Sequence, residues 1–184
     1  MSFIKWVPAV FFALACAGCT VTDDLFPTGK DERGIGDAGT VGPGVGQSAP
    51  GFSTLTSLSD SITLSSELAQ PGTRAVVLYF AMWCPVCNSH MDHLVRGVIP
   101  LFPDVRFLAV DYLSGSVGDV RANVVANGYA AAPLSVLADL DNAITAAYKG
   151  TMGTTVVIDG AGIVRMNEDY KNGARLRQML EGLP

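Results

Sequence analysis

Residues 76–87 read VVLYFAMWCPVC, and this stretch decides the fold. Its first part is a continuous run of Val, Leu, Tyr and Phe, which is typical of a strand buried on both faces of a sheet. The chain then passes through Trp83 and Cys84 to Pro85. Proline is well tolerated in the first turn of a helix, because its missing N–H would have no partner there. The sequence therefore predicts a central strand that leads directly into a helix.

The two cysteines of this stretch sit where the helix begins. Free backbone N–H groups and the helix dipole favour negative charge at that point, so a thiolate at Cys84 is stabilised. The thiolate is the nucleophilic form of cysteine. Cys87 follows about one helical turn later, within reach of a disulfide to Cys84, and Pro85 fixes the backbone between them. We expect Cys84 to attack a partner's disulfide and Cys87 to resolve the mixed disulfide.

A C-x-x-C pair also occurs in zinc and haem sites. Zinc would need further soft ligands, and covalent haem would need a histidine directly after Cys87, where Asn88 stands. His90 and His93 follow at three-residue steps, so Cys84, Cys87 and His90 could share one helix face and bind copper or zinc. A metal-delivery protein with these three ligands stays an alternative. The leading expectation is a redox-active disulfide with no further cofactor.

Strand and helix patterns alternate through the rest of the chain and end in a hairpin and a helix. This order predicts an α/β fold, with a central mixed β-sheet flanked by helices on both faces. The expected strands are residues 62–64, 74–80, 105–110, 134–137, 154–158 and 163–166, and the expected helices are residues 65–69, 85–98, 116–127, 139–148 and 172–183.

Residues 76–87 resemble the active-site stretch of the thioredoxin-like superfamily, and in particular of its TlpA/ResA (redoxin) branch of tethered thiol–disulfide oxidoreductases. Two further segments agree: residues 49–52 (APGF) resemble the entry segment of redoxin and peroxiredoxin relatives, and residues 154–160 (TTVVIDG) resemble the strand and turn after the active-site loop. The resemblance implies a thioredoxin-like fold over residues 49–184. It also implies that Cys84 and Cys87 exchange electrons with the cysteines of exported proteins, with a membrane electron donor if the protein works as a reductant.

The same resemblance assigns the surroundings of the cysteines. Trp83 and Pro85 are expected to line the active site, together with Met152 and Gly153 in the facing loop. Family members usually carry a cis-proline where Gly153 stands, so the substrate groove is expected to be looser. Relatives often bury an acidic side chain beneath the cysteines, at the position of Leu78 here. Proton handling must then come from elsewhere, and Tyr79 and Asp111 are the candidates.

A peroxidase of the peroxiredoxin kind is the second enzymatic alternative. Those relatives use a threonine shortly before the reactive cysteine to orient the peroxide. No Thr or Ser lies between Val76 and Cys84, and Ala81 occupies that region. The residues therefore favour disulfide exchange over peroxide reduction.

The first 48 residues have the pattern of an export and tethering region. Residues 1–19 have an apolar stretch too short to span a bilayer, closed by Ala17-Gly18-Cys19, which resembles a lipoprotein signal with Cys19 as the lipid-modified residue. Residues 20–48 are rich in Gly and poor in large apolar side chains, as expected for a flexible linker. The organisation predicted is a signal segment, a linker, and a domain over residues 49–184, on the periplasmic side of a bacterial envelope.

Composition and net charge limit the classes of partner that the protein is expected to bind. The 184-residue chain carries a net charge of −5 without a basic stripe, which argues against nucleic-acid binding. Of its four cysteines, Cys16 and Cys19 fall in the signal segment, so only Cys84 and Cys87 remain in the folded part. Two neighbouring cysteines cannot join distant parts of a domain, and a structural disulfide framework is not expected. The motif leaves open the direction of electron flow.

Overall fold

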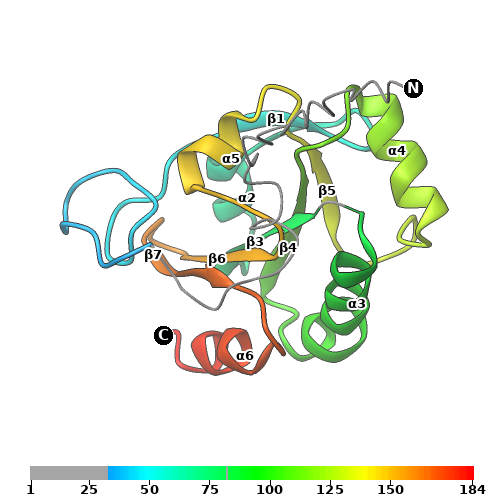
Figure 1. The fold of residues 1–184 in the computed structure, drawn as a ribbon. Helices are drawn as coiled ribbons and strands as arrows, with labels where there is room; N and C mark the ends of the chain where they lie inside the picture. Colours follow the sequence, from blue (N-terminus) through cyan, green and yellow to red (C-terminus); the bar gives the residue numbers. More distant parts are fainter. Residues whose placement is uncertain (1–32, 82) are drawn as a thin grey trace, which may run out of the picture.

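The computed structural model describes residues 33–81 and 83–184, so the predicted signal segment, with Cys16 and Cys19, lies outside the described residues. Within the described part, one seven-stranded sheet has the order β2-β1-β5-β4-β3-β6-β7 (Figure 1). The strands β3, β4 and β5 run parallel, and the other neighbours pair antiparallel. The strands are β1 (Ser53–Thr56), β2 (Ser61–Thr63), β3 (Ala75–Ala81), β4 (Val105–Asp111), β5 (Ser135–Ala138), β6 (Thr154–Asp159) and β7 (Val164–Asp169).

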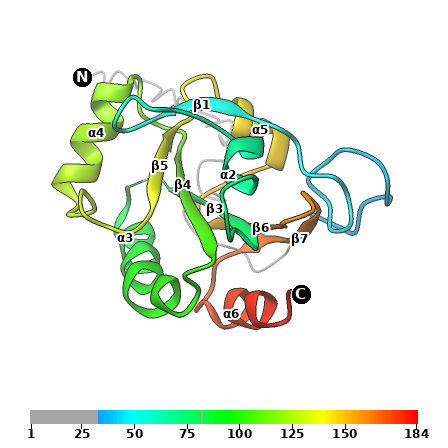
Figure 2. The ribbon, with the colours of Figure 1, turned by 180° about the vertical axis from the view of Figure 1, so that it is seen from behind.

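Strand β3 lies between β4 and β6, and all seven of its residues are buried. Its alternate side chains enter two separate cores, as the period of two in a strand requires. Val77 and Tyr79 pack with helices α3, α4 and α6, whereas Val76, Leu78 and Phe80 pack with α2 and α5 on the opposite face. Figures 1 and 2 show α3 and α6 on one side of the sheet and α2 and α5 on the other. The predicted mixed sheet with helices on both faces is confirmed.

The helices follow the predicted order. They are α2 (Leu64–Leu68), α3 (Pro85–His93), α4 (Val117–Ala126), α5 (Ala143–Tyr148) and α6 (Ala174–Glu181); α3 continues into a π-helical turn, η1 (Leu94–Val98), and a 3₁₀ turn, η2 (Ile99–Leu101). In the part of the chain that the structure describes, none of the helices has the length and apolar character needed to cross a membrane.

Apart from small shifts of other element ends, strand β1 and the start of helix α5 differ from the sequence prediction. Strand β1, with the sequence STLT, was not predicted, because its mostly polar residues become a strand only by pairing with β2 and β5. Helix α5 begins at Ala143 rather than at residue 139. The carboxylate of Asp139 accepts hydrogen bonds from the backbone N–H of Ile144 (3.0 Å) and Thr145 (2.8 Å), so this residue caps the helix from outside it.

Part of the segment predicted to be a flexible linker is ordered. Residues 33–48 form a loop that lies beside β7 (Figure 1) and extends the sheet by backbone hydrogen bonds. The N–H of Gly46 donates to the carbonyl of Val164 at 2.9 Å, and the N–H of Val164 donates to the carbonyl of Gln47 at 2.9 Å. Within the loop, the Gln47 side chain packs directly against Gly36 and Gly42, where a Cβ atom would lie 2.2 to 2.5 Å from it. These glycines provide room for Gln47, so residues 33–48 pack on themselves and contact the edge of the sheet.

Candidate active site

Cys84 is the N-cap residue of α3, at the junction between the central strand and the helix. Its backbone is extended, with φ −87° and ψ 164°, and its sulfur accepts a hydrogen bond from the N–H of Cys87 at 3.3 Å. The two sulfur atoms lie 3.2 Å apart, and no disulfide bond joins them. Cys84 is partly exposed, whereas Cys87 is completely buried. No acidic residue stands in the first turn of α3, so the helix N-terminus faces Cys84 with its positive end unopposed there.

Trp83 is anchored rather than loosely packed. It has a left-handed backbone with φ 53°, a costly conformation for a bulky residue. Its indole N–H donates to Asp111 at 2.6 Å, and its ring lies 6.3 Å from that of Tyr129. Both carboxylate oxygens of Asp111 are used here, because Ser114 and the backbone N–H of Leu113 donate to them as well. Asp111 therefore holds Trp83 and the turn after β4.

The loop before β6 brings Met152 and Gly153 to the cysteines. The sulfur of Met152 lies 3.4 Å from the sulfur of Cys84. Gly153 has a φ of +81°, which glycine adopts without strain. Its N–H donates to the carbonyl of Phe80 at 3.0 Å, and its carbonyl accepts from the N–H of Tyr170 at 2.7 Å. These bonds on both sides of the peptide give the loop a defined position without proline.

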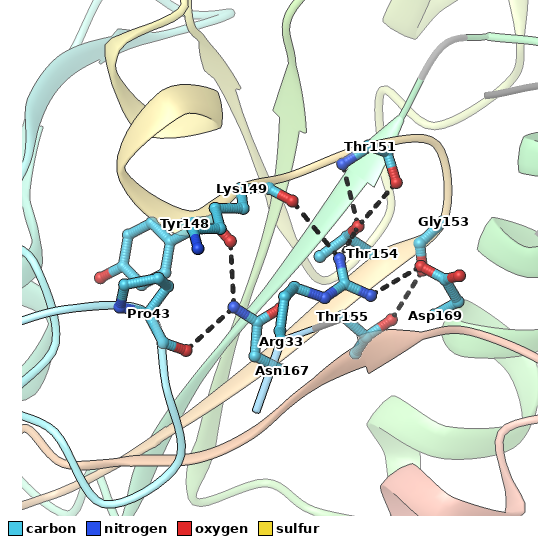
Figure 3. Close-up of polar contacts among 10 residues, drawn as sticks. All are labelled: Arg33, Pro43, Tyr148, Lys149, Thr151, Gly153, Thr154, Thr155, Asn167 and Asp169. Carbon is cyan, nitrogen blue, oxygen red and sulfur yellow. Dashed lines mark hydrogen bonds and ion pairs between the residues drawn. The ribbon is translucent and has the colours of Figure 1, made fainter. Parts of the chain in front are cut away.

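The far side of this loop is held by Arg33 (Figure 3). Its guanidinium donates to Thr154 Oγ1 at 2.6 Å and pairs with the carboxylate of Asp169 at 2.7 Å. Thr154 Oγ1 also accepts from the N–H of Thr151 at 2.9 Å. The two charged side chains are only 8% and 12% exposed, so water screens the pair weakly. One end of the residue 33–48 loop thus braces the segment that carries Met152.

A cluster of two tyrosines and two histidines lies on the same face of the sheet as α3. The hydroxyl of Tyr79 is 3.0 Å from His90 Nδ1 and also hydrogen-bonds Cys87. The centroid of the Tyr170 ring lies 5.8 Å from that of Tyr79 and 4.7 Å from that of His90. The Tyr170 hydroxyl is hydrogen-bonded to His93 Nδ1. Leu78 lies in the other core, so the side chain of β3 that hydrogen-bonds the buried thiol is that of the next residue, Tyr79.

Burial sets the protonation of this cluster. It raises the pKa of Tyr79 well above its usual value, and the neighbouring Cys87 raises it further. Burial also raises the pKa of Tyr170 to about 12. The pKa of His90 is lowered by burial and then by His93. At neutral pH the two phenols are therefore protonated and His90 is uncharged.

The three ligands proposed for a metal do not come together. Among residues 33–81 and 83–184, no group of three His, Cys, Asp or Glu side chains is close enough to hold a metal ion. His90 directs Nδ1 to the Tyr79 hydroxyl instead. Sequence reasoning named His90 and Tyr79 separately but missed Tyr170, which lies far along the chain and carries no local motif.

Comparison with known proteins identifies the family. The family model described as "AhpC/TSA family" matches residues 45–167. The chain belongs to the AhpC/TSA family. The matched region begins inside the ordered loop and includes the cysteines and the facing loop. A search of curated proteins finds no match for this AhpC/TSA protein.

Solved structures give the same fold. DsbF of Mycobacterium tuberculosis is 25% identical with a TM-score of 0.59, over 72% of this chain and 95% of that one. A putative thiol:disulfide interchange protein DsbE from Chlorobium tepidum is 21% identical with a TM-score of 0.61, over 74% and 95%. A 2-Cys peroxiredoxin of Plasmodium vivax is 19% identical with a TM-score of 0.59, over 74% and 80%. This AhpC/TSA protein is thus a thioredoxin-like oxidoreductase.

Proposed function

We propose that Cys84 and Cys87 are the redox pair of a thiol–disulfide oxidoreductase, with Cys84 as the nucleophile and Cys87 as the resolving thiol. The observation that carries this assignment is the asymmetry of the pair. Cys84 is partly exposed at a helix N-terminus, and Cys87 is completely buried, with its sulfur 3.2 Å from that of Cys84. Only Cys84 is accessible to a partner, and a disulfide formed there is within reach of Cys87.

The partners we propose are cysteine-containing exported proteins. Val86, between the two cysteines, is 38% exposed, and Trp83 is partly exposed beside it. These apolar groups suit the contact of an extended polypeptide with Cys84. The Ala17-Gly18-Cys19 pattern supports a lipid anchor at Cys19 and a place outside the cytoplasm. A membrane electron donor would supply this site if it works as a reductant.

Mixed-disulfide trapping tests the assignment. Wild-type protein should catalyse the reduction of insulin disulfides by dithiothreitol, and Cys84→Ser should abolish the catalysis. Cys87→Ser should accumulate a covalent complex through Cys84 that dithiothreitol releases, whereas a Cys16→Ser, Cys19→Ser control should behave as wild type. A covalent complex that survives Cys84→Ser would contradict the proposed roles.

Peroxide reduction is a second candidate, because the AhpC/TSA family and the peroxiredoxin likeness favour it. The structure of the site argues against it, since Ala81 is buried three residues before Cys84 and carries no hydroxyl to orient a peroxide. We expect slow oxidation of Cys84 by hydrogen peroxide, without rapid turnover. Peroxide turnover faster than insulin reduction would make the peroxidase the better assignment.

A further inference from the structure

The resolving thiol must lose a proton in a site closed to water. Cys87 is 0% exposed, and only its thiolate attacks a disulfide efficiently. Leu78, directly before Tyr79 in β3, is also 0% exposed but packs in the other core and carries no group that could accept a proton. Cys87 therefore needs a proton acceptor from another side chain.

Tyr79 and His90 form a path from this thiol toward solvent. The Tyr79 hydroxyl hydrogen-bonds Cys87 on one side and lies 3.0 Å from His90 Nδ1 on the other. Tyr79 is 2% exposed, whereas His90 is only partly buried at the surface of α3. A proton that enters at the buried sulfur can thus leave at a ring that water reaches.

We infer that Tyr79 relays the proton of Cys87 to His90 when Cys87 resolves the mixed disulfide. This inference rests on the proposed function and adds to it the acid–base residues of its second step. Tyr79 is the catalytic residue of this step because it touches the reacting sulfur. His90 acts through Tyr79: it positions the Tyr79 hydroxyl by a hydrogen bond and accepts the relayed proton.

The step is balanced within the site. The S–H bond of Cys87 breaks, its proton moves to the Tyr79 oxygen, and the hydroxyl proton of Tyr79 moves to His90 Nδ1. The Cys87 thiolate attacks the sulfur of Cys84, a Cys84–Cys87 disulfide forms, and the bond from Cys84 to the partner breaks. The partner leaves as a thiolate and is reduced, while the two cysteines are oxidised. His90 then loses the proton to water.

The protonation states fit a relay rather than an ionised tyrosine. Burial, reinforced by Cys87, Cys84 and Tyr170, raises the pKa of Tyr79 so far that it keeps a proton throughout. Burial and the nearby His93 lower the pKa of His90, so its ring is uncharged at neutral pH, and the relay uses the tautomer that carries its proton on Nε2. The ring of Tyr170, 4.7 Å from that of His90, holds the imidazole in place.

Single-turnover kinetics with one equivalent of 5,5′-dithiobis(2-nitrobenzoate) separate the two steps. Each sulfur attack releases one absorbing aryl thiolate, the first from Cys84 and the second from Cys87. The full chain carries Cys16→Ser and Cys19→Ser, so only the site cysteines react. Tyr79→Phe removes the relay hydroxyl and keeps the ring. Tyr148→Phe is the matched control, because its buried hydroxyl bonds Pro50 instead.

We expect Tyr79→Phe to slow the second release at least tenfold, given that acid–base catalysis contributes roughly 100- to 10,000-fold. Its first release, and both releases in Tyr148→Phe, should stay within about twofold of the parent chain. In the parent chain, the rate of the second release should fall as the pH drops through the titration of His90. His90→Gln, at a partly exposed position, should not show this fall. Second-phase rates and pH profiles unchanged in both Tyr79→Phe and His90→Gln would overturn the relay. Absence of the first release would refute the proposed function itself.

Discussion

The Arg33–Asp169 pair offers the sharpest test of whether the N-terminal loop belongs to the folded unit. Replacing Arg33 with Ala removes one bond to Asp169 at 2.7 Å and one to Thr154 at 2.6 Å. A hydrogen bond to a charged group contributes about 1.5 to 3 kcal/mol, and breaking a buried pair from one side costs roughly 3 to 5 kcal/mol. Because Asp169 keeps 12% exposure, part of that cost is recovered by water. We expect a loss of about 3 kcal/mol in the free energy of unfolding.

Urea denaturation followed by tryptophan fluorescence measures this loss. With a urea slope of about 2 kcal/mol per M, the midpoint should fall by roughly 1.5 M. Arg96→Ala is the control: Arg96 is 81% exposed and 4.0 Å from Asp92, so its removal should change stability by less than about 0.5 kcal/mol. If Arg33→Ala unfolds at the same urea concentration as Arg96→Ala, the loop does not brace the domain.

Two further predictions concern pH and packing. The pKa of His90 is lower in the folded chain than its unfolded value of 6.5. Below about pH 6.5 the unfolded chain therefore binds more protons than the folded chain. The free energy of unfolding should fall there by at most about 1.4 kcal/mol per pH unit. His90→Gln should flatten this acid limb in urea titrations from pH 7 to 5, and an unchanged limb would exclude His90 as its source. In thermal unfolding, Gly150→Ala should cost about 1 to 3 kcal/mol, because its Cβ would lie 2.4 Å from the buried ring of Phe80. Gly118→Ala, in helix α4 with its nearest neighbour at 3.6 Å, should be neutral or stabilising; equal effects of the two would contradict the packing.

The fold was predictable because its strongest signal is local. A run of buried apolar residues specifies β3, and Pro85 directly after Cys84 specifies where α3 begins. The alternation of strand and helix patterns then fixes the class of sheet. Strand β1 escaped prediction because pairing with β2 and β5, rather than its own residues, makes it a strand.

The ordered loop shows the limit of composition as a guide. A glycine-rich segment is predicted to be flexible, because glycine has more backbone freedom than any other residue. Here Gly36, Gly42 and Gly44 leave room for Gln47, and the order of the segment depends on contacts with β7 and with Asp169. No local pattern encodes those distant partners.

The site was also predictable only in part, because some of its contacts join residues that lie far apart in the sequence. The cysteines and the facing Met152–Gly153 loop follow from a short motif and a family resemblance. The pairing of Tyr79 with His90, and the contact of both with Tyr170, depends on how α3 and the end of β7 pack on the sheet. The same packing places Asp111 in a hydrogen bond with Trp83, whereas Tyr79 hydrogen-bonds Cys87. Of the two candidates for proton handling, it is therefore Tyr79 that lies at the buried thiol.

The most direct test of the central claim is a redox titration of the Cys84–Cys87 couple. The full chain with Cys16→Ser and Cys19→Ser would be equilibrated in graded thiol–disulfide buffers, and its free thiols trapped and counted by mass. We predict one reversible two-electron transition, with both thiols lost together, at a potential between about −120 and −270 mV. A midpoint near the lower value would indicate a reductant, and one near the upper value an oxidant. If the two thiols do not oxidise together and reversibly, this pair is not the redox centre.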